Sequence, residues 1–256
     1  MLKSNLYDNI FHRKSVRKYN LKNKNIDLEK VKEFLDNAER LNDSKVEFKI
    51  ITKDYLNSRY MKPATYYIAA FSEDSRLGLN NIGFILEQLD LYLSQNNIGA
   101  CWEGIPKAKD KLNELSELNF KIVLAFGRTK ENIYRKHRTE FNRKPIHEIA
   151  YFSNIKMTDP IKRVVEGLQY APSARNSQPW YIYFNNENSI DFYCKNPSFI
   201  DKRMGMDKYN QIDTGIGLLC LCLSIKKENR KYYINYNNDL KDVLKDYYYI
   251  CNIEIE

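Results

Sequence analysis

Apolar residues recur with helical spacing in some segments of the chain and alternate with polar ones in others. In residues 159–170 they fall at offsets of 0, 3, 4 and 7 from Ile161, which predicts an amphipathic helix. Pro172 lacks an N–H and disfavours the helical conformation of the residue before it, so the helix is expected to end there. Beyond Pro179 the sequence WYIYF alternates and is rich in aromatic residues, which predicts a strand.

The same patterns predict elements along the whole chain. In the first part we expect a helix over 26–41 with Asp27 as its N-cap, strands over 45–52 and 61–71, a long helix over 79–98 that ends at Gly99, a loop over 100–109, a short helix and a buried strand over 120–127. After a basic connection over 128–152, we expect the helix before Pro172, strands over 180–184 and 189–194, a long helix over 209–229 and a strand over 231–236.

This order of elements repeats. Helix, loop, strand, strand, long helix, loop and strand occur twice at an offset of roughly 130 residues, which indicates an internal duplication. We therefore predict an α+β fold of two related halves, residues 1–155 and 156–256, with the boundary near Phe152–Thr158.

Composition narrows the class of protein. With 43% hydrophobic and 29% charged residues among 256, the chain suits a globular protein with a sizeable core. No apolar run of membrane-spanning length occurs, and the start lacks an apolar signal core, so we expect a cytoplasmic protein that does not associate with membranes. Five cysteines, an odd number without a C-x-x-C pair, favour reduced thiols and no metal site. The net charge of +8 comes from Lys and Arg scattered beside Asp and Glu, which is typical of solvated faces and does not favour nucleic-acid binding.

The loop YAPSARNSQPW places several hydrogen-bonding side chains between the helix and the strand that flank it. Ser and Asn favour turns, so a plain surface turn is the simpler interpretation. However, the two halves carry different polar segments. The first has the basic arm HRKSVRKY and the segment CWEG, and the second has the Ser-Asn loop but no basic arm. This division suggests one composite site built from both halves.

These segments together resemble the FMN-dependent nitroreductase family. RKSVRKY is similar to the family's N-terminal arm, APSARNSQPW to its Pro-Ser-x-x-Asn-x-Gln-Pro-Trp loop, NNIGACWEGIP to the segment after its long helix, and NRKPIHEI to a basic segment. The apparent duplication is similar to the single-chain, pseudo-dimeric branch of that family. The resemblance implies a nitroreductase-like α+β fold and an FMN-dependent oxidoreductase. NADH or NADPH would be the reductant, and electrons would pass in ping-pong order to a nitroaromatic, a quinone or a similar small molecule.

The resemblance also implies which residues bind the cofactor. They are Arg13, Lys14, Ser15, Arg17, Trp102, Glu103, Gly104, Arg143, Pro172, Ser173, Ala174, Asn176 and Gln178. Arg13 and Ser15 suit the FMN phosphate because Arg can donate two parallel hydrogen bonds. Arg143 and Lys144 are further candidates for the phosphate.

For the flavin ring, Arg17 takes the family's position near the N1–O2 edge, where a positive charge favours the reduced form. Asn176 carries a donor and an acceptor on one amide and suits the pyrimidine edge, with Ser173 nearby. A backbone N–H of Glu103 or Gly104 is expected at N5. No catalytic acid or base is expected, since positioning and electrostatics suffice for hydride transfer.

Simpler interpretations stand beside these. Taken alone, Arg13 and Arg17 are typical of a solvated face, Cys101 of a small buried hydrophobe, Trp180 of a core anchor, and Asp213 of a helix cap. A flavin-binding protein with little turnover, serving storage or sensing, is the alternative function. If one composite site is built within one chain, we expect one FMN per chain, a second position filled by side chains, and a monomer in solution.

Overall fold

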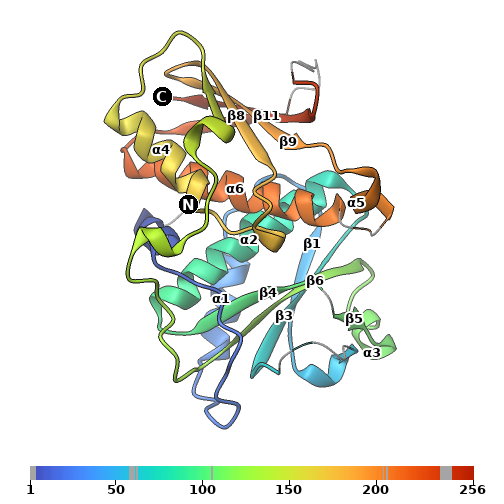
Figure 1. Ribbon diagram of the computed structural model, residues 1–256. Coiled ribbons are helices and arrows are strands. Elements are labelled where there is room, and N and C mark those ends of the chain that lie inside the picture. Colours follow the sequence, from blue (N-terminus) through green and yellow to red (C-terminus); the bar gives the residue numbers. More distant parts are fainter. Residues whose placement is uncertain are drawn as a thin grey trace. The chain divides into compact units, whose positions relative to one another are not determined.

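The computed structural model describes residues 4–57, 61, 63–104, 106–203, 205, 207–236 and 244–256. The chain divides into two compact units, Met1–Glu140 and Phe141–Glu256, and Figure 1 shows the elements of each. The predicted halves divide at residue 155 instead. Residues 141–155 group with unit 2 because strand β7 (Ala150–Phe152) pairs with a strand of its sheet.

Unit 1 is built on an antiparallel sheet of four strands. Their order is β1-β3-β6-β4, with β1 at Val46–Ile51, β3 at Tyr66–Ser72, β6 at Asn119–Gly127 and β4 at Gly99–Glu103. Helix α2 (Arg76–Gln95) packs on this sheet and also contacts helix α1 (Leu28–Asp36) and the 3₁₀ helix η1 (Ser4–Phe11). Strands β2 (Leu56–Asn57) and β5 (Lys107–Ala108) form a small ribbon, which helix α3 (Asp110–Asn113) follows. The apolar cluster of the unit joins Leu56 and Leu112 from this region to Tyr67 and Phe71 on β3.

Helix α1 begins where the sequence predicts, α2 begins three residues before the predicted residue 79, and both end earlier than predicted. Asp27 caps α1 by accepting a hydrogen bond from the N–H of Lys30 at 3.2 Å, but the helix stops at Asp36 and does not reach residue 41. Helix α2 stops at Gln95, where Asn97 adopts a left-handed φ of 56°, and so the prediction that Gly99 ends it is wrong. Asn tolerates this conformation through its short polar side chain.

Gly99 instead begins strand β4, which the sequence assigned to a loop. Residues Gly99–Glu103 pair in register with β6, from Gly99 opposite Gly127 to Glu103 opposite Val123. A Cβ added at Gly99 would lie 2.8 Å from Cγ1 of Val16. Glycine is therefore required here because the N-terminal arm passes directly over the strand.

Unit 2 has a five-stranded sheet of order β10-β11-β9-β8-β7. Its strands are β10 (Tyr232–Asn235), β11 (Tyr247–Ile255), β9 (Ser189–Lys195), β8 (Trp180–Asn186) and β7, and only the β7–β8 pair is parallel. Helices α4 (Asp159–Tyr170) and α6 (Asp207–Lys227) pack together, and a short helix α5 (Phe199–Arg203) precedes α6. Residues Trp180, Ile182 and Phe184 are buried and alternate with half-buried tyrosines, which confirms the predicted strand and the core position of Trp180.

The two units repeat the same topology. The order β1-β3-β6-β4 in unit 1 corresponds to β8-β9-β11-β10 in unit 2, to which β7 adds an edge strand. Helices α4 and α6 begin 131 residues after α1 and α2. The fold is α+β, and the predicted repetition of elements is present. A pseudo-dimeric arrangement of the units stays a prediction. None of the helices in the described part of the chain is long and apolar enough to cross a membrane.

Helices α4 and α6 approach closely at Gly167. The stripe predicted from Ile161 onward is buried on α4, and Gly167 lies on the same helix. A Cβ added at Gly167 would lie 1.8 Å from Oγ of Ser224 and 2.9 Å from the backbone oxygen of Cys220. Backbone cannot give way as a flexible side chain can, so this contact fixes how near the two helices lie.

We expect Gly167→Ala to destabilise the protein by about 1–3 kcal/mol, the usual cost of overpacking, although alanine is the better helix former. Urea unfolding followed by circular dichroism measures this. Ser224→Ala is the control, because it removes the nearest atom and leaves the backbone contact. The double variant, Gly167→Ala with Ser224→Ala, should recover part of the lost free energy of unfolding. A Gly167→Ala protein as stable as the wild type would show that the helices can separate without cost.

Candidate functional site

The N-terminal arm of unit 1 lies beside strand β4 as an additional short strand. The N–H of Val16 donates to the backbone oxygen of Ala100 at 2.9 Å, and Ser15 forms a parallel bridge with the same residue. On the other side of the arm, the N–H of Arg135 donates to the backbone oxygen of His12 at 2.7 Å. The structure therefore brings the arm next to the CWEG segment, as the resemblance implies.

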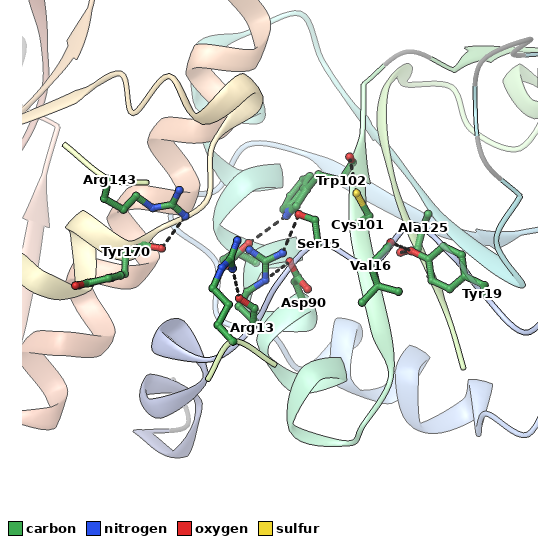
Figure 2. A network of polar contacts seen from close by, with 12 residues as sticks. Arg13, Ser15, Val16, Tyr19, Asp90, Cys101, Trp102, Ala125, Arg143 and Tyr170 are labelled. Atoms are coloured by element: carbon green, nitrogen blue, oxygen red, sulfur yellow. Dashed lines mark hydrogen bonds and ion pairs between the residues drawn. The ribbon is translucent and has the colours of Figure 1, made fainter. Parts of the chain in front are cut away.

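Arg13 is held inside unit 1. Only 3% of the residue is exposed, and its Nε lies 3.1 Å from Oδ2 of Asp90 on α2. Its Nη2 donates to Oγ of Ser15 at 3.4 Å (Figure 2). Nη1 of Arg135 donates to the backbone oxygen of Arg13 at 2.6 Å. Burial raises the pKa of Asp90, and the guanidinium of Arg13 opposes that rise. The structure thus places Arg13 in an internal ion pair, where the sequence suggested a phosphate ligand.

The other predicted residues of the arm and at the end of β4 are more exposed than Arg13. Arg17 is exposed, whereas Lys14, Ser15, Trp102, Glu103 and Gly104 are half-buried. The indole N–H of Trp102 donates to Oε2 of the buried Glu87 at 3.1 Å. Cys101 is buried, and burial raises its pKa to about 11 although Arg17 lies near enough to oppose the rise. It therefore remains a thiol in the core, as its simpler interpretation predicts.

The Ser-Asn loop of unit 2 has an uncommon backbone. Arg175, Asn176 and Gln178 have φ angles of 52°, 56° and 48°. Left-handed backbone costs a residue other than glycine roughly 1–2 kcal/mol. Three such residues within four positions persist only where the surroundings fix them, which is typical of functional sites.

A buried acidic side chain supplies part of that constraint. Both side-chain oxygens of Asp213 accept the N–H of Ala174 at 3.0 Å, and Oγ of Ser177 lies 3.5 Å from Oδ2. Oγ of Ser173 accepts the N–H of Gln178 at 2.9 Å. Asp213 lies within α6 rather than at its start, so the expectation that it caps this helix is wrong. Burial raises the pKa of Asp213 to about 8, and the two loop donors oppose the rise.

The basic segment 142–144 makes the other contacts that constrain the Ser-Asn loop. Arg143 donates from Nη1 to Oδ1 of Asn176, and Nδ2 of Asn176 donates to the backbone oxygen of Asn142. The N–H of Lys144 donates to Oε1 of Gln178 at 2.9 Å, and its Nζ donates to the backbone oxygen of Gln178 at 2.9 Å. Within unit 2, the predicted residues from Pro172 to Gln178 and Arg143 therefore form one connected set.

A family model described as "Putative TM nitroreductase" matches residues 5–225. The chain belongs to this nitroreductase family. The crystal structure of a "putative nitroreductase" from Thermotoga maritima matches with a TM-score of 0.66 and 20% identity, over 98% of this chain and 92% of that chain. At this identity the nitroreductase likeness establishes the fold.

Other nitroreductase-family structures match more weakly. Nitroreductase A from Vibrio parahaemolyticus matches with a TM-score of 0.44 and 16% identity, over 62% of this chain and 78% of that one. An iodotyrosine deiodinase bound to FMN and 3-iodo-L-tyrosine matches with a TM-score of 0.39 and 18% identity, over 50% of this chain and 91% of that one. No curated protein matches the sequence significantly.

The sequence interpretation missed two residues that hold the site in place and gave a third the wrong role. Glu87 and Asp90 on α2, and Asp213 on α6, are buried acidic residues on helices that are otherwise largely apolar at their centres. Acidic residues are almost never fully buried unless they are paired. An acidic residue within an apolar helical run was therefore the available signal, but the run does not show which distant group is the partner.

Asp213 predicts a specific pH dependence of stability. Its carboxyl keeps a proton up to about pH 8 when folded and loses it near its usual pKa of 3.8 when unfolded. The folded state therefore binds more protons between these values, and stability falls as pH rises from 4 to 8. In Asp213→Asn this contribution is absent. We expect the free energy of unfolding of the wild type to fall more steeply than that of the variant, by up to about 1.4 kcal/mol per pH unit.

Urea unfolding at pH 5, 6, 7 and 8 measures the difference. Asp201→Asn is the matched control, because Ser198 lowers the pKa of the half-buried Asp201 and its titration lies below this range. The free energy of unfolding of this control should change with pH as that of the wild type does. Parallel curves for the wild type and Asp213→Asn would show that Asp213 is ionised throughout.

Proposed function

We propose that this protein is an FMN-dependent NAD(P)H oxidoreductase of the nitroreductase type. Membership of the family supports the class of reaction, and the Ser-Asn loop carries the assignment to this chain. Its three left-handed residues are fixed by Asp213 and by segment 142–144, so that Asn176 is held in one orientation. Such a rigid and costly loop is what a site that reads a planar ring requires.

The donors and acceptors of this loop fit the edge of a flavin. Within unit 2, the amide of Asn176 donates one N–H of its Nδ2 and accepts one hydrogen bond at its Oδ1. Its second N–H and the second lone pair of Oδ1 can therefore still bind a ligand. The hydroxyl of Ser173 accepts one hydrogen bond and still has its own proton to donate. A pyrimidine edge presents both kinds of group, so the residues match it chemically.

In unit 1 the exposed Arg17 supplies a positive charge. No hydrogen bond or ion pair engages its side chain among the residues that the structure describes. We assign Arg17 to the N1–O2 edge of the flavin, and a backbone N–H of Glu103 or Gly104 to N5. Ser15 and Arg143 are the candidates for the phosphate. Arg13 positions Ser15, to which it donates a hydrogen bond.

The chemistry that FMN supplies when bound is acceptance of a hydride from NADH or NADPH, and delivery of electrons in ping-pong order to an acceptor such as a nitroaromatic or a quinone. The residues of this chain bind and orient the reactants and stabilise negative charge; none is assigned as an acid or base. We further propose a monomer with one FMN per chain. All five cysteines are buried and none forms a disulfide, which supports our assignment to the reducing cytoplasm.

Anaerobic reduction tests the function directly. The purified protein should bind one FMN per chain, and NADH or NADPH should bleach its flavin absorbance. A nitroaromatic or quinone added afterwards should restore it. A flavin that binds but is not bleached would favour storage or sensing, and a chain that binds no FMN would contradict both functions.

Replacing Arg17 tests its assignment. We expect Arg17→Ala to weaken FMN binding about tenfold and to shift the reduction potential to more negative values, because a charge-assisted hydrogen bond to the reduced ring is lost. Fluorescence titration and a spectroscopic redox titration measure the two effects. Lys22→Ala, which removes another exposed cation five positions further along the chain, should change neither the affinity nor the potential. Unchanged affinity and potential in Arg17→Ala would refute the assignment.

A further inference from the structure

Unit 2 contains a cavity beside the Ser-Asn loop. Its volume is about 240 Å³, and it lies between the loop, the end of β9 and the start of α6. A cavity of this size holds far more than one water molecule but is smaller than the 300–1,000 Å³ or so of pockets for drug-sized ligands. It therefore has room for a small ligand only.

The charged side chains of its wall are mostly positive. Lys144, Arg175 and Lys195 line the cavity, and Asp201 is the one acidic residue among the lining residues that the structure describes. The pKa of Lys144 is lowered by burial and, after that, by the charge of Lys195. Cations gathered in this way repel one another, and an anion between them would remove that cost.

The donors of these cations are largely uncommitted. Nζ of Lys144 makes one hydrogen bond, to the backbone oxygen of Gln178, out of the three that an ammonium can donate. Within the described ranges, no hydrogen bond or ion pair engages the side chain of Arg175 or Lys195. Asp201 offsets only part of this charge. Ser198 and, after it, Arg175 and Lys195 lower its pKa, but its Oδ2 accepts the hydroxyl of Ser198 at 2.7 Å and no ion pair joins it to a described cation.

We propose that this cavity binds a small organic anion, whose phosphate or carboxylate group is held by Lys144, Arg175 and Lys195. Arg175 can donate two parallel hydrogen bonds to such a group, and the two lysines add point charges. The hydroxyl of Ser177 lines the same wall and can donate as well. The site uses Lys144, which the sequence offered only as a further candidate for the FMN phosphate, and none of the side chains that the proposed function assigns to FMN. The inference does not rest on flavin chemistry.

Titration calorimetry of the full chain tests the proposal. Saturating FMN is present, so that a phosphate subsite of the flavin is already filled. Inorganic phosphate and malonate are titrated separately at low salt. We expect saturable binding of at least one of them, weakened by added salt. Binding of phosphate alone, malonate alone or both then identifies the ligand group as phosphate, carboxylate or either.

Variants locate the site. Arg175→Gln and Lys195→Gln should each weaken binding about tenfold or more, and Arg175→Lys should retain most of it. Lys202→Gln is the matched control, an exposed lysine on α5 that does not line the cavity. Circular dichroism checks that each variant is folded. The absence of saturable binding, or equal affinity in the wild type and both Gln variants, would overturn the proposal. Anion binding by a protein whose flavin is not reduced would refute the proposed enzyme and not this site.

Discussion

Each unit depends on an acidic side chain that its long central helix buries. Asp90 on α2 meets the guanidinium of Arg13, and Asp213 on α6 meets the N–H of Ala174. A buried carboxylate is costly unless it is paired or hydrogen-bonded, and removing the partner of a buried ion pair typically costs about 3–5 kcal/mol. The partner segments are therefore fixed in place by the helices. They are the arm and the Ser-Asn loop, the segments to which the proposed function assigns most of its binding residues.

Although their topology repeats, the two units use different contacts to hold the arm and the Ser-Asn loop in place. Asp90 lies in the second half of α2, whereas Asp213 lies in the first half of α6, so the two acidic residues are not at equivalent positions of the repeat. One is paired with a side chain and the other with backbone. The repeated sheet and helix therefore provide a common frame. The polar contacts that hold the arm in unit 1 and the loop in unit 2 are particular to each unit.

Local patterns in the sequence predicted most of the fold and part of the candidate site. The stripe on α4 and the alternation in β8 depend on neighbouring residues alone, and both were predicted with nearly correct bounds. Strand β4 was missed because Gly99 is typical of a helix end, and its real role is contact with Val16. The partners of Asp90 and Asp213 could not be predicted, because each pair joins residues from 39 to 77 positions apart and no local pattern encodes such a contact.

The left-handed backbone of the Ser-Asn loop explains how one short segment could contact both proposed ligands. Reversal of the chain at Arg175 and Asn176 sends alternate residues to different surroundings. Asn176 and Gln178 bind segment 142–144, whereas Arg175 and Ser177 line the cavity. Because Asp213 holds the loop through the backbone of Ala174, changing the side chain of Arg175 leaves that contact in place. The anion site and the proposed flavin contacts can therefore be altered separately, while the loop that supports both depends on Asp213.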